Sequence, residues 1–319
     1  MQKKGMTAYV SRRLALTLPV LVLVLFGSFA LLRLIPGSAA ELRAGAGQSQ
    51  ADIARLEAQF GLDDPIPVQF LNWVGRLVTG DLGESIWTTE PVSEEIKRRF
   101  PPTAELAVLA AFFSVILAVP AGTMAALNQD RWPDRLLQVV TAVGLAIPNF
   151  FLATLVIMLP ARWWGWTPPT GYVSLFDDPV ENLQRMALPA IIIALAQAAV
   201  ITRLTRSSLL EVLRQDYIRT ARAKGLAGRT VVLRHGFRNA MVPIVTIFGL
   251  QFATLLGGSV IIESVFSIPG MGAGVLTAIG RRDYDLAQTL ILIFGLIHII
   301  SVFITDMIYT VIDPRIKYT

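Results

Sequence analysis

The sequence contains no cysteine and only two histidines among its 319 residues. The absence of cysteine excludes disulfides, thiolate metal sites and a cysteine nucleophile, and it leaves the redox compartment undetermined. The two histidines, His235 and His298, are too far apart in the sequence to suggest a metal site. We expect His235 to be solvated or to contact a partner, and His298 to have a packing role inside an apolar run.

The phosphate-binding pattern GxxxxGK[ST] is also absent, because none of the lysines follows a glycine. The glycine-rich stretch 267–274, SIPGMGAG, follows an apolar run instead of a strand, and no lysine follows it directly. We predict a tight turn there. The chain therefore lacks a P-loop of its own, and we expect it to carry no cofactor, no metal and no catalytic residue.

Charged residues are scarce, at 16% against 54% hydrophobic residues, and the mean hydropathy is positive. This composition indicates an integral membrane protein. Uncharged apolar runs approach the roughly 20 residues that cross a bilayer, and each should be a helix. We predict an all-α polytopic protein with six transmembrane helices, kinked where the runs contain proline, at 14–32, 106–129, 136–161, 186–202, 239–262 and 286–305.

The charge distribution predicts the orientation of these helices. With the N-terminus in the cytoplasm, the inner segments collect 17 basic and 5 acidic residues, and the outer segments 11 basic and 15 acidic ones. Glu105, Glu263 and Asp306 lie at or within span ends and are left out of these counts. Basic residues favour the cytoplasmic side, so both termini are expected inside. The first run is longer than the apolar part of a cleaved signal peptide, which favours a retained span over cleavage after 38–40.

These boundaries give a cytoplasmic N-terminus at 1–13, a first transmembrane helix at 14–32, an external segment at 33–105 and a five-helix core at 106–319. The external segment is too long for an idle connection. A helix is predicted from 49–52 to the stop at Gly61, and a second amphipathic piece covers 68–78. The segment either contacts a soluble partner or caps the pathway, or it covers neighbouring helices at the membrane interface.

Several uncharged polar residues interrupt the apolar runs. Such side chains usually face protein or a water-filled cavity, and hydrogen bonding between helices is the commoner role for each alone. The aromatic residues of 163–172 follow a span and are typical of an interface belt. The candidates for lining a pathway are Asn149, Gln197, Thr246 and Gln251.

The segment 203–238 has nine basic and two acidic residues between two apolar runs, which places it in the cytoplasm. Leu209, Leu213 and Tyr217 recur at helical spacing, and Gly225 stands where a helix would end. A loop that only sets topology would explain the charge but not this spacing, so we favour a docking element. Nucleic-acid binding is not expected, because topology accounts for the charge.

The motif DYIRTARAKGL at 216–226, with His235 and RNAMVP at 238–243, resembles the coupling loop in membrane subunits of ATP-binding-cassette importers of the dipeptide, oligopeptide and nickel type. Two departures exist: the general Glu-Ala-Ala pattern is Arg219-Thr220-Ala221 here, and Ser38-Ala39 replaces Asp-Pro. The resemblance covers nearly the whole chain, with further matches in RLIPG at 33–37, GLDDP at 61–65, GDLGES at 80–85, IPNF at 147–150, VFSIPGMG at 265–272 and DPRI at 313–316.

The resemblance implies a type I importer permease that forms half of a pathway for short peptides, although the sequence does not identify the solute. Implied partners are a second homologous permease, two ATPase subunits that bind ATP and magnesium, an external solute-binding protein and membrane lipid. The implied ATPase-coupling residues are Tyr217, Arg219, Ala221, Arg222, Lys224, Gly225, Leu226, His235 and Asn239.

The main alternative is a secondary transporter driven by protons or sodium. Such proteins usually carry ionisable residues inside their spans. Only Glu263 and Asp306 approach the membrane here, both near the ends of runs. A membrane enzyme is a weaker alternative, because no cluster of acids, bases or metal ligands is evident.

Overall fold

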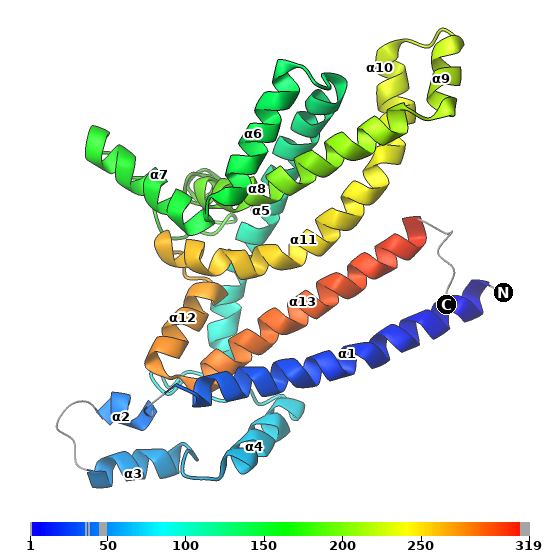
Figure 1. Ribbon diagram of the computed structural model, residues 1–319. Coiled ribbons are helices and arrows are strands. Elements are labelled where there is room, and N and C mark those ends of the chain that lie inside the picture. The colour runs from blue at the N-terminus through cyan, green and yellow to red at the C-terminus, as the bar shows by residue number, and fades with distance from the viewer. Residues whose placement is uncertain (1, 36, 38, 45–49, 313–319) are drawn as a thin grey trace. The chain divides into compact units, whose positions relative to one another are not determined.

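The computed structural model describes residues 2–35, 37, 39–44 and 50–312. Helices dominate, and no strand occurs among the described residues, which confirms the all-α prediction. The elements follow one another along the chain as shown in Figure 1: α1 (Gln2–Arg33), α2 (Ala39–Ala44), α3 (Gln50–Gln59), α4 (Ile66–Val78), α5 (Val92–Leu127), α6 (Trp132–Ala146), α7 (Asn149–Trp164), α8 (Pro179–Leu213), α9 (Asp216–Ala223), α10 (Gly228–Thr230), the π-helical turn η1 (Val231–Phe237), α11 (Arg238–Val265), α12 (Met271–Arg281) and α13 (Tyr284–Ile312).

Four helices among the described residues are long and apolar enough to cross a membrane. They are α1 over Ala15–Arg33, α5, α8, and α13 over Tyr284–Thr305. The consecutive helices α6 and α7 would together supply a fifth span, bent by 97°. Each of these coincides with a predicted apolar run, and the 28-residue α11 covers the remaining run at 239–262.

The run 136–161 is two helices, which corrects the prediction of a single kinked one. Ile147 ends α6 with extended backbone, at φ −84° and ψ 121°, and Pro148 is extended as well. A proline disfavours helical backbone in the residue before it, so the chain turns at this point. Pro189 and Pro243 lie inside the continuous helices α8 and α11, so proline alone does not decide between a kink and a break.

The described residues form two compact units, and each has its own core. The first unit comprises Met1–Thr103 and Pro269–Ile300, and the second comprises Ala104–Ile268 and Ser301–Lys317, as far as the described residues reach. The helices α5 and α13 each contribute residues to both units.

The first unit contains the predicted external helices. The helix α3 is followed by Gly61 in the left-handed region at φ 62°, and α4 covers the predicted amphipathic piece. Two apolar clusters hold this unit together. The buried members are Phe29, Leu32, Ala39, Trp73, Ile86, Val92, Met271, Ala278, Tyr284, Leu286, Ala287, Leu290 and Leu292.

The helix α12 was not predicted, because its glycines obscure the helical pattern. The chain turns through Ser267 at φ 55°, and Gly270 then precedes an 11-residue helix. Gly274 reflects close packing: a Cβ there would lie 2.9 Å from Arg99 Cδ and 3.1 Å from Leu290 Cδ1, so a larger residue would have to displace these side chains.

In the second unit, α8 packs against α6, α7 and α11, and Figure 1 shows α8 and α11 side by side. The main core includes Leu106, Met186, Ile192, Leu255 and Phe266. The helix α8 continues beyond its apolar run to Leu213, so the first part of the predicted basic loop is helical. The segments α9, α10 and η1 follow and lead the chain into α11.

Candidate functional site

The segment between α8 and α11 is where the sequence predicts docking. Arg214 and Gln215 form a turn, and Gln215 is extended at φ −70° and ψ 150° before α9 begins. This break shifts the helical register, so the apolar stripe predicted for Leu209, Leu213 and Tyr217 does not continue into α9. Ile218 is fully buried, whereas the side chain of Tyr217 is 43% exposed.

The inner face of α9 is held by a small apolar cluster. Ile218 and Ala221 are buried with Val231 of η1, and Leu213 of α8 packs against them. Tyr217 is tied to α11, because the Asn239 side-chain amide donates a 2.8 Å hydrogen bond to its hydroxyl. Three other elements, α8, η1 and α11, therefore fix the orientation of α9.

The end of α9 has the geometry of a Schellman motif. The Leu226 amide donates to the Ala221 carbonyl at 3.4 Å, and the Gly225 amide donates to the Arg222 carbonyl at 2.9 Å. Gly225 lies at φ 77°, which a residue with a side chain adopts only under strain. The predicted helix stop at Gly225 is confirmed.

The outer face of this segment is polar and exposed. Arg219, Arg222, Lys224, Gly225 and Leu226 are all exposed, so their side chains and backbone are available to a partner. The pair between Arg219 and Asp216 is too exposed to restrain either side chain strongly. Asn239 is exposed and His235 half-buried. Ala221 differs from its predicted role, because its side chain packs inward in the chain's own cluster.

A buried ion pair joins α6 to α8 close to this segment. The Arg206 guanidinium donates to Asp134 through Nε at 2.6 Å and through Nη2 at 2.7 Å. The Asp134 carboxylate also accepts hydrogen bonds from the Gln138 amide and from the Asp130 backbone N–H. Asp134 is 0% exposed. Sequence reasoning counted Arg206 and Asp134 only as cytoplasmic charges, and no local signal pairs residues so far apart.

The candidate pathway residues lie on three helices, α7, α8 and α11. Gln197 on α8 is buried, and its amide donates to the Gln251 backbone carbonyl on α11 at 3.2 Å. Asn149 is half-buried at the start of α7, and Thr246 is half-buried on α11. Gln197 thus links two helices, the commoner role of polar residues in spans. His298 on α13 is exposed in this chain, contrary to the expected packing role.

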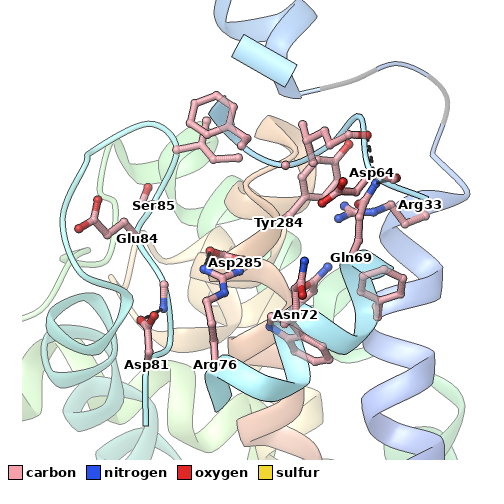
Figure 2. A pocket seen from close by; sticks show the side chains of 18 of the residues that line it. Arg33, Asp64, Gln69, Asn72, Arg76, Asp81, Glu84, Ser85, Tyr284 and Asp285 are labelled. Atoms are coloured by element: carbon pink, nitrogen blue, oxygen red, sulfur yellow. Dashed lines mark hydrogen bonds and ion pairs between the residues drawn. The ribbon is translucent and has the colours of Figure 1, made fainter. Parts of the chain in front are cut away.

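A polar cavity lies in the first unit, and Figure 2 shows its labelled side chains. Its volume is about 610 Å³, and it is lined by the end of α1, by α4, by the loop 80–90 and by the start of α13. Arg76 of α4 donates two 2.9 Å hydrogen bonds to the Asp285 carboxylate of α13. Burial alone would lower the pKa of Arg76, but the hydrogen bonds and charge of Asp285 raise it.

The loop 80–90 is held on the N-terminal side of α13. The Ser85 hydroxyl and the Ile86 amide both donate to the Asp283 carboxylate, with the Ile86 amide at 3.2 Å. Burial raises the pKa of Asp283 above its ordinary value, although these hydrogen bonds oppose the shift. Gly83 packs so closely that a Cβ there would lie 2.1 Å from Asp285 Oδ2. Within the described residues, no group of three or more potential metal ligands occurs.

Two family profiles together cover nearly the whole chain. Residues 118–318 match the profile of the binding-protein-dependent transport system inner membrane component. The chain belongs to this family. Residues 6–107 match the profile of the N-terminal region of the same kind of membrane component. The predicted family membership is therefore confirmed. Some residues of the motifs named above, Pro36, Ser38, Ser49 and the tail motif at 313–316, lie outside the described residues.

Relatives of this inner membrane component match over their full length. A Brucella abortus protein described as a peptide transport system permease is 40% identical over 98% of this chain and 100% of its own. The glutathione transport system permease protein GsiC of Salmonella typhimurium is 39% identical with the same coverage.

The fold is also that of known importer subunits. A chain of the MetNI methionine ABC transporter aligns at a TM-score of 0.57 and 18% identity, over 71% of this chain and 100% of that chain. A chain of an amino acid ABC transporter aligns at 0.51 and 13% identity, over 70% and 95% of the two chains. This inner membrane component is thus a multi-pass permease subunit of an ATP-binding-cassette importer.

Proposed function

We propose that this permease subunit forms half of a transmembrane pathway for short peptides. The observation that carries this proposal is the full-length match to a peptide transport permease and to a glutathione transport permease. Glutathione is itself a small peptide, so both relatives point to the same class of solute. The pathway candidates remain Asn149, Gln197, Thr246 and Gln251.

The topology that fits this function has six spans with both termini in the cytoplasm. The bent pair α6 and α7 counts as one span in this arrangement, and α11 counts as another. The basic side chains between α8 and α11 then lie inside, as positive charge favours. The segment at 33–105 lies outside, and the five-helix core spans 106–319.

Coupling to ATP hydrolysis takes place at α9 and the turn that follows it. Arg219, Arg222 and Lys224 are exposed there and can pair with acidic groups on an ATPase subunit. Because α9 is packed onto α8 and η1 and hydrogen-bonded to α11, a force on α9 passes into two long helices. The assembly would contain a second homologous permease, two ATPases and an external solute-binding protein. ATP and magnesium bind to the ATPases, and this chain has no catalytic role.

A secondary transporter remains the natural contrast for an experiment. Glu263 is a fully buried acid in α11, and it accepts a 3.0 Å hydrogen bond from Ser259. A buried acid is a feature that proton-driven transporters use. Family membership favours ATP as the energy source.

Uptake of labelled trialanine by cells that express the complete transporter tests the proposal. ATP is depleted while the proton gradient is held constant by an external pH jump and an ionophore. We expect uptake to stop. Uptake that continues until the gradient is collapsed would instead support a proton-coupled transporter.

A further inference from the structure

The cavity of the first unit collects buried polar atoms that have no hydrogen-bond partner. Arg33 contributes two of them, Nε and Nη1, and Trp73 Nε1 and Gln288 Nε2 contribute one each. Gln69 Oε1 is a buried acceptor in the same condition. All four residues line the cavity. Donors therefore outnumber acceptors among the unsatisfied atoms.

Unsatisfied groups of this kind need an explanation, because buried polar atoms are nearly always hydrogen-bonded. A cluster with excess N–H donors, two of them on the cation Arg33, matches an anionic group with several acceptor lone pairs. A carboxylate meets that description. Arg33 is the centre of the cluster, since it alone carries a charge.

Aromatic rings hold Arg33 by its flat faces. Its guanidinium carbon lies 4.0 Å from the centroid of the Tyr284 ring and 4.9 Å from that of Phe29. Contacts of this kind engage the face of the guanidinium. They leave the N–H groups at its edge available for hydrogen bonds. Nε and Nη1, the two atoms without a partner, are at this edge. The side chain is thus pre-positioned before a ligand arrives.

The opposite part of the cavity is acidic. Figure 2 shows Arg33 and Gln69 on one side, Asp81 and Glu84 on the other, and the pair of Arg76 and Asp285 between them. Asp81 and Glu84 are exposed, and the two charges of the central pair offset each other. The cavity therefore presents Arg33 at one end, with the exposed Asp64 beside it, and the acids Asp81 and Glu84 at the other. A volume of about 610 Å³ is in the usual range of small-molecule sites.

We propose that this cavity binds a short zwitterionic peptide, with its C-terminal carboxylate on Arg33 and its ammonium group toward Asp81 and Glu84. The choice of ligand rests on the proposed function, because peptides are the solute inferred there. The helix α4 and the loop 80–90 lie outside the candidate spans, whereas Arg33 and Tyr284 stand at the ends of the spans Ala15–Arg33 and Tyr284–Thr305, so the site lies where these two spans end. The permease then contacts its solute through its external segment.

Equilibrium binding of trialanine to the purified transporter complex tests this proposal. The complex is kept free of the solute-binding protein and of nucleotide, and calorimetry compares trialanine with trialanine amide, which lacks the carboxylate. We expect the amide to bind at least tenfold more weakly. The substitution Arg33→Met keeps an apolar stem between the two rings and should weaken trialanine binding by at least tenfold, whereas Arg162→Met, an exposed arginine at the end of α7, should not.

Several outcomes would overturn the proposal that this cavity binds a peptide. These are no binding of trialanine, equal binding of the amide, or displacement of the peptide by inorganic phosphate as readily as by unlabelled trialanine. Binding that survives Arg33→Met but is lost on Gln251→Ala would move the site to the pathway. If Arg33→Met fails to assemble, the comparison of the two peptides on the unaltered complex still decides.

Transport separates this inference from the proposed function. ATP-dependent uptake of trialanine by a complex that shows no carboxylate-dependent binding would leave the peptide importer intact and remove the cavity site. Carboxylate-dependent binding without ATP-dependent uptake would keep the site and refute the importer of short peptides.

Discussion

The Arg206 side chain of α8 donates two hydrogen bonds to the Asp134 carboxylate of α6, and the carboxylate is completely enclosed. Arg206 lies in the part of α8 that leads into the turn before α9. A second contact follows the same line, where Arg203 Nε donates to the Thr141 hydroxyl at 3.3 Å. The helix α8, which leads into α9, is therefore braced against α6 by side chains.

Removing one member of this pair should destabilise the protein. For Asp134→Ala we expect a loss of about 2 kcal/mol, between the values for exposed and for fully buried pairs, because Arg206 is partly exposed. The melting temperature of the purified complex measures the effect. The double variant Asp134→Ala with Arg206→Met should recover much of the loss, since no unpaired charge remains. Two additive losses would show that the pair is not coupled.

Gly122 of α5 should tolerate no side chain. A Cβ there would lie 2.5 Å from Thr205 Cβ and 2.7 Å from the Thr202 carbonyl oxygen of α8. Gly122→Ala should therefore lower the melting temperature by forcing α5 and α8 apart. Gly257→Ala is the matched control in α11, where nothing lies within 4 Å, and alanine should be neutral or stabilising by up to about 1 kcal/mol. Equal effects of the two substitutions would contradict the close packing at Gly122.

The turn after α9 should depend on the backbone freedom of Gly225. Gly225→Val places a branched side chain at φ 77°, at a cost of about 1–2 kcal/mol, although no atom obstructs the side chain. We expect the complex to assemble and hydrolyse ATP while peptide uptake falls several-fold. Gly228→Val is the control, because Gly228 also has open space but no left-handed backbone. Normal uptake by the Gly225 variant would argue against a role of this turn in coupling.

Tyr172 should give the second unit a pH dependence at high pH. Burial, together with a 2.9 Å hydrogen bond to Glu105, raises the pKa of Tyr172 from 10.0 to about 12. Because the unfolded chain ionises first, the contribution of Tyr172 to stability is complete below pH 10 and is lost as the pH rises through 12. In Tyr172→Phe this loss should disappear, and absorbance of tyrosinate should reach its plateau at a lower pH. If the tyrosinate titration of Tyr172→Phe were the same as that of the unaltered protein, the raised pKa would belong to a tyrosine other than Tyr172.

The sequence predicted those elements whose signals are local. The apolar runs located the long helices, and Gly61 and Gly225 located the ends of α3 and α9 because both adopt left-handed backbone. The segment 203–238 was singled out by its charge and by its family resemblance. These features depend on residues that are neighbours along the chain.

Contacts between distant residues were not predictable in the same way. The break at Pro148 depends on how α6 and α7 each pack on α8, and proline is also found inside the continuous helix α11. The pairing of Asp134 with Arg206 has no sequence signature. The cavity of the first unit is assembled from α1, α4, a loop and α13, so its polar residues look unrelated when read in order.

The 97° elbow between α6 and α7 has a consequence for the surroundings of the chain. One helix stops and another starts there, so the last carbonyls of α6 and the first amides of α7 have no partners within their own helices. Hydrocarbon cannot satisfy them. In the proposed six-span topology the elbow lies within the membrane, so these groups would face protein or water there and not lipid tails.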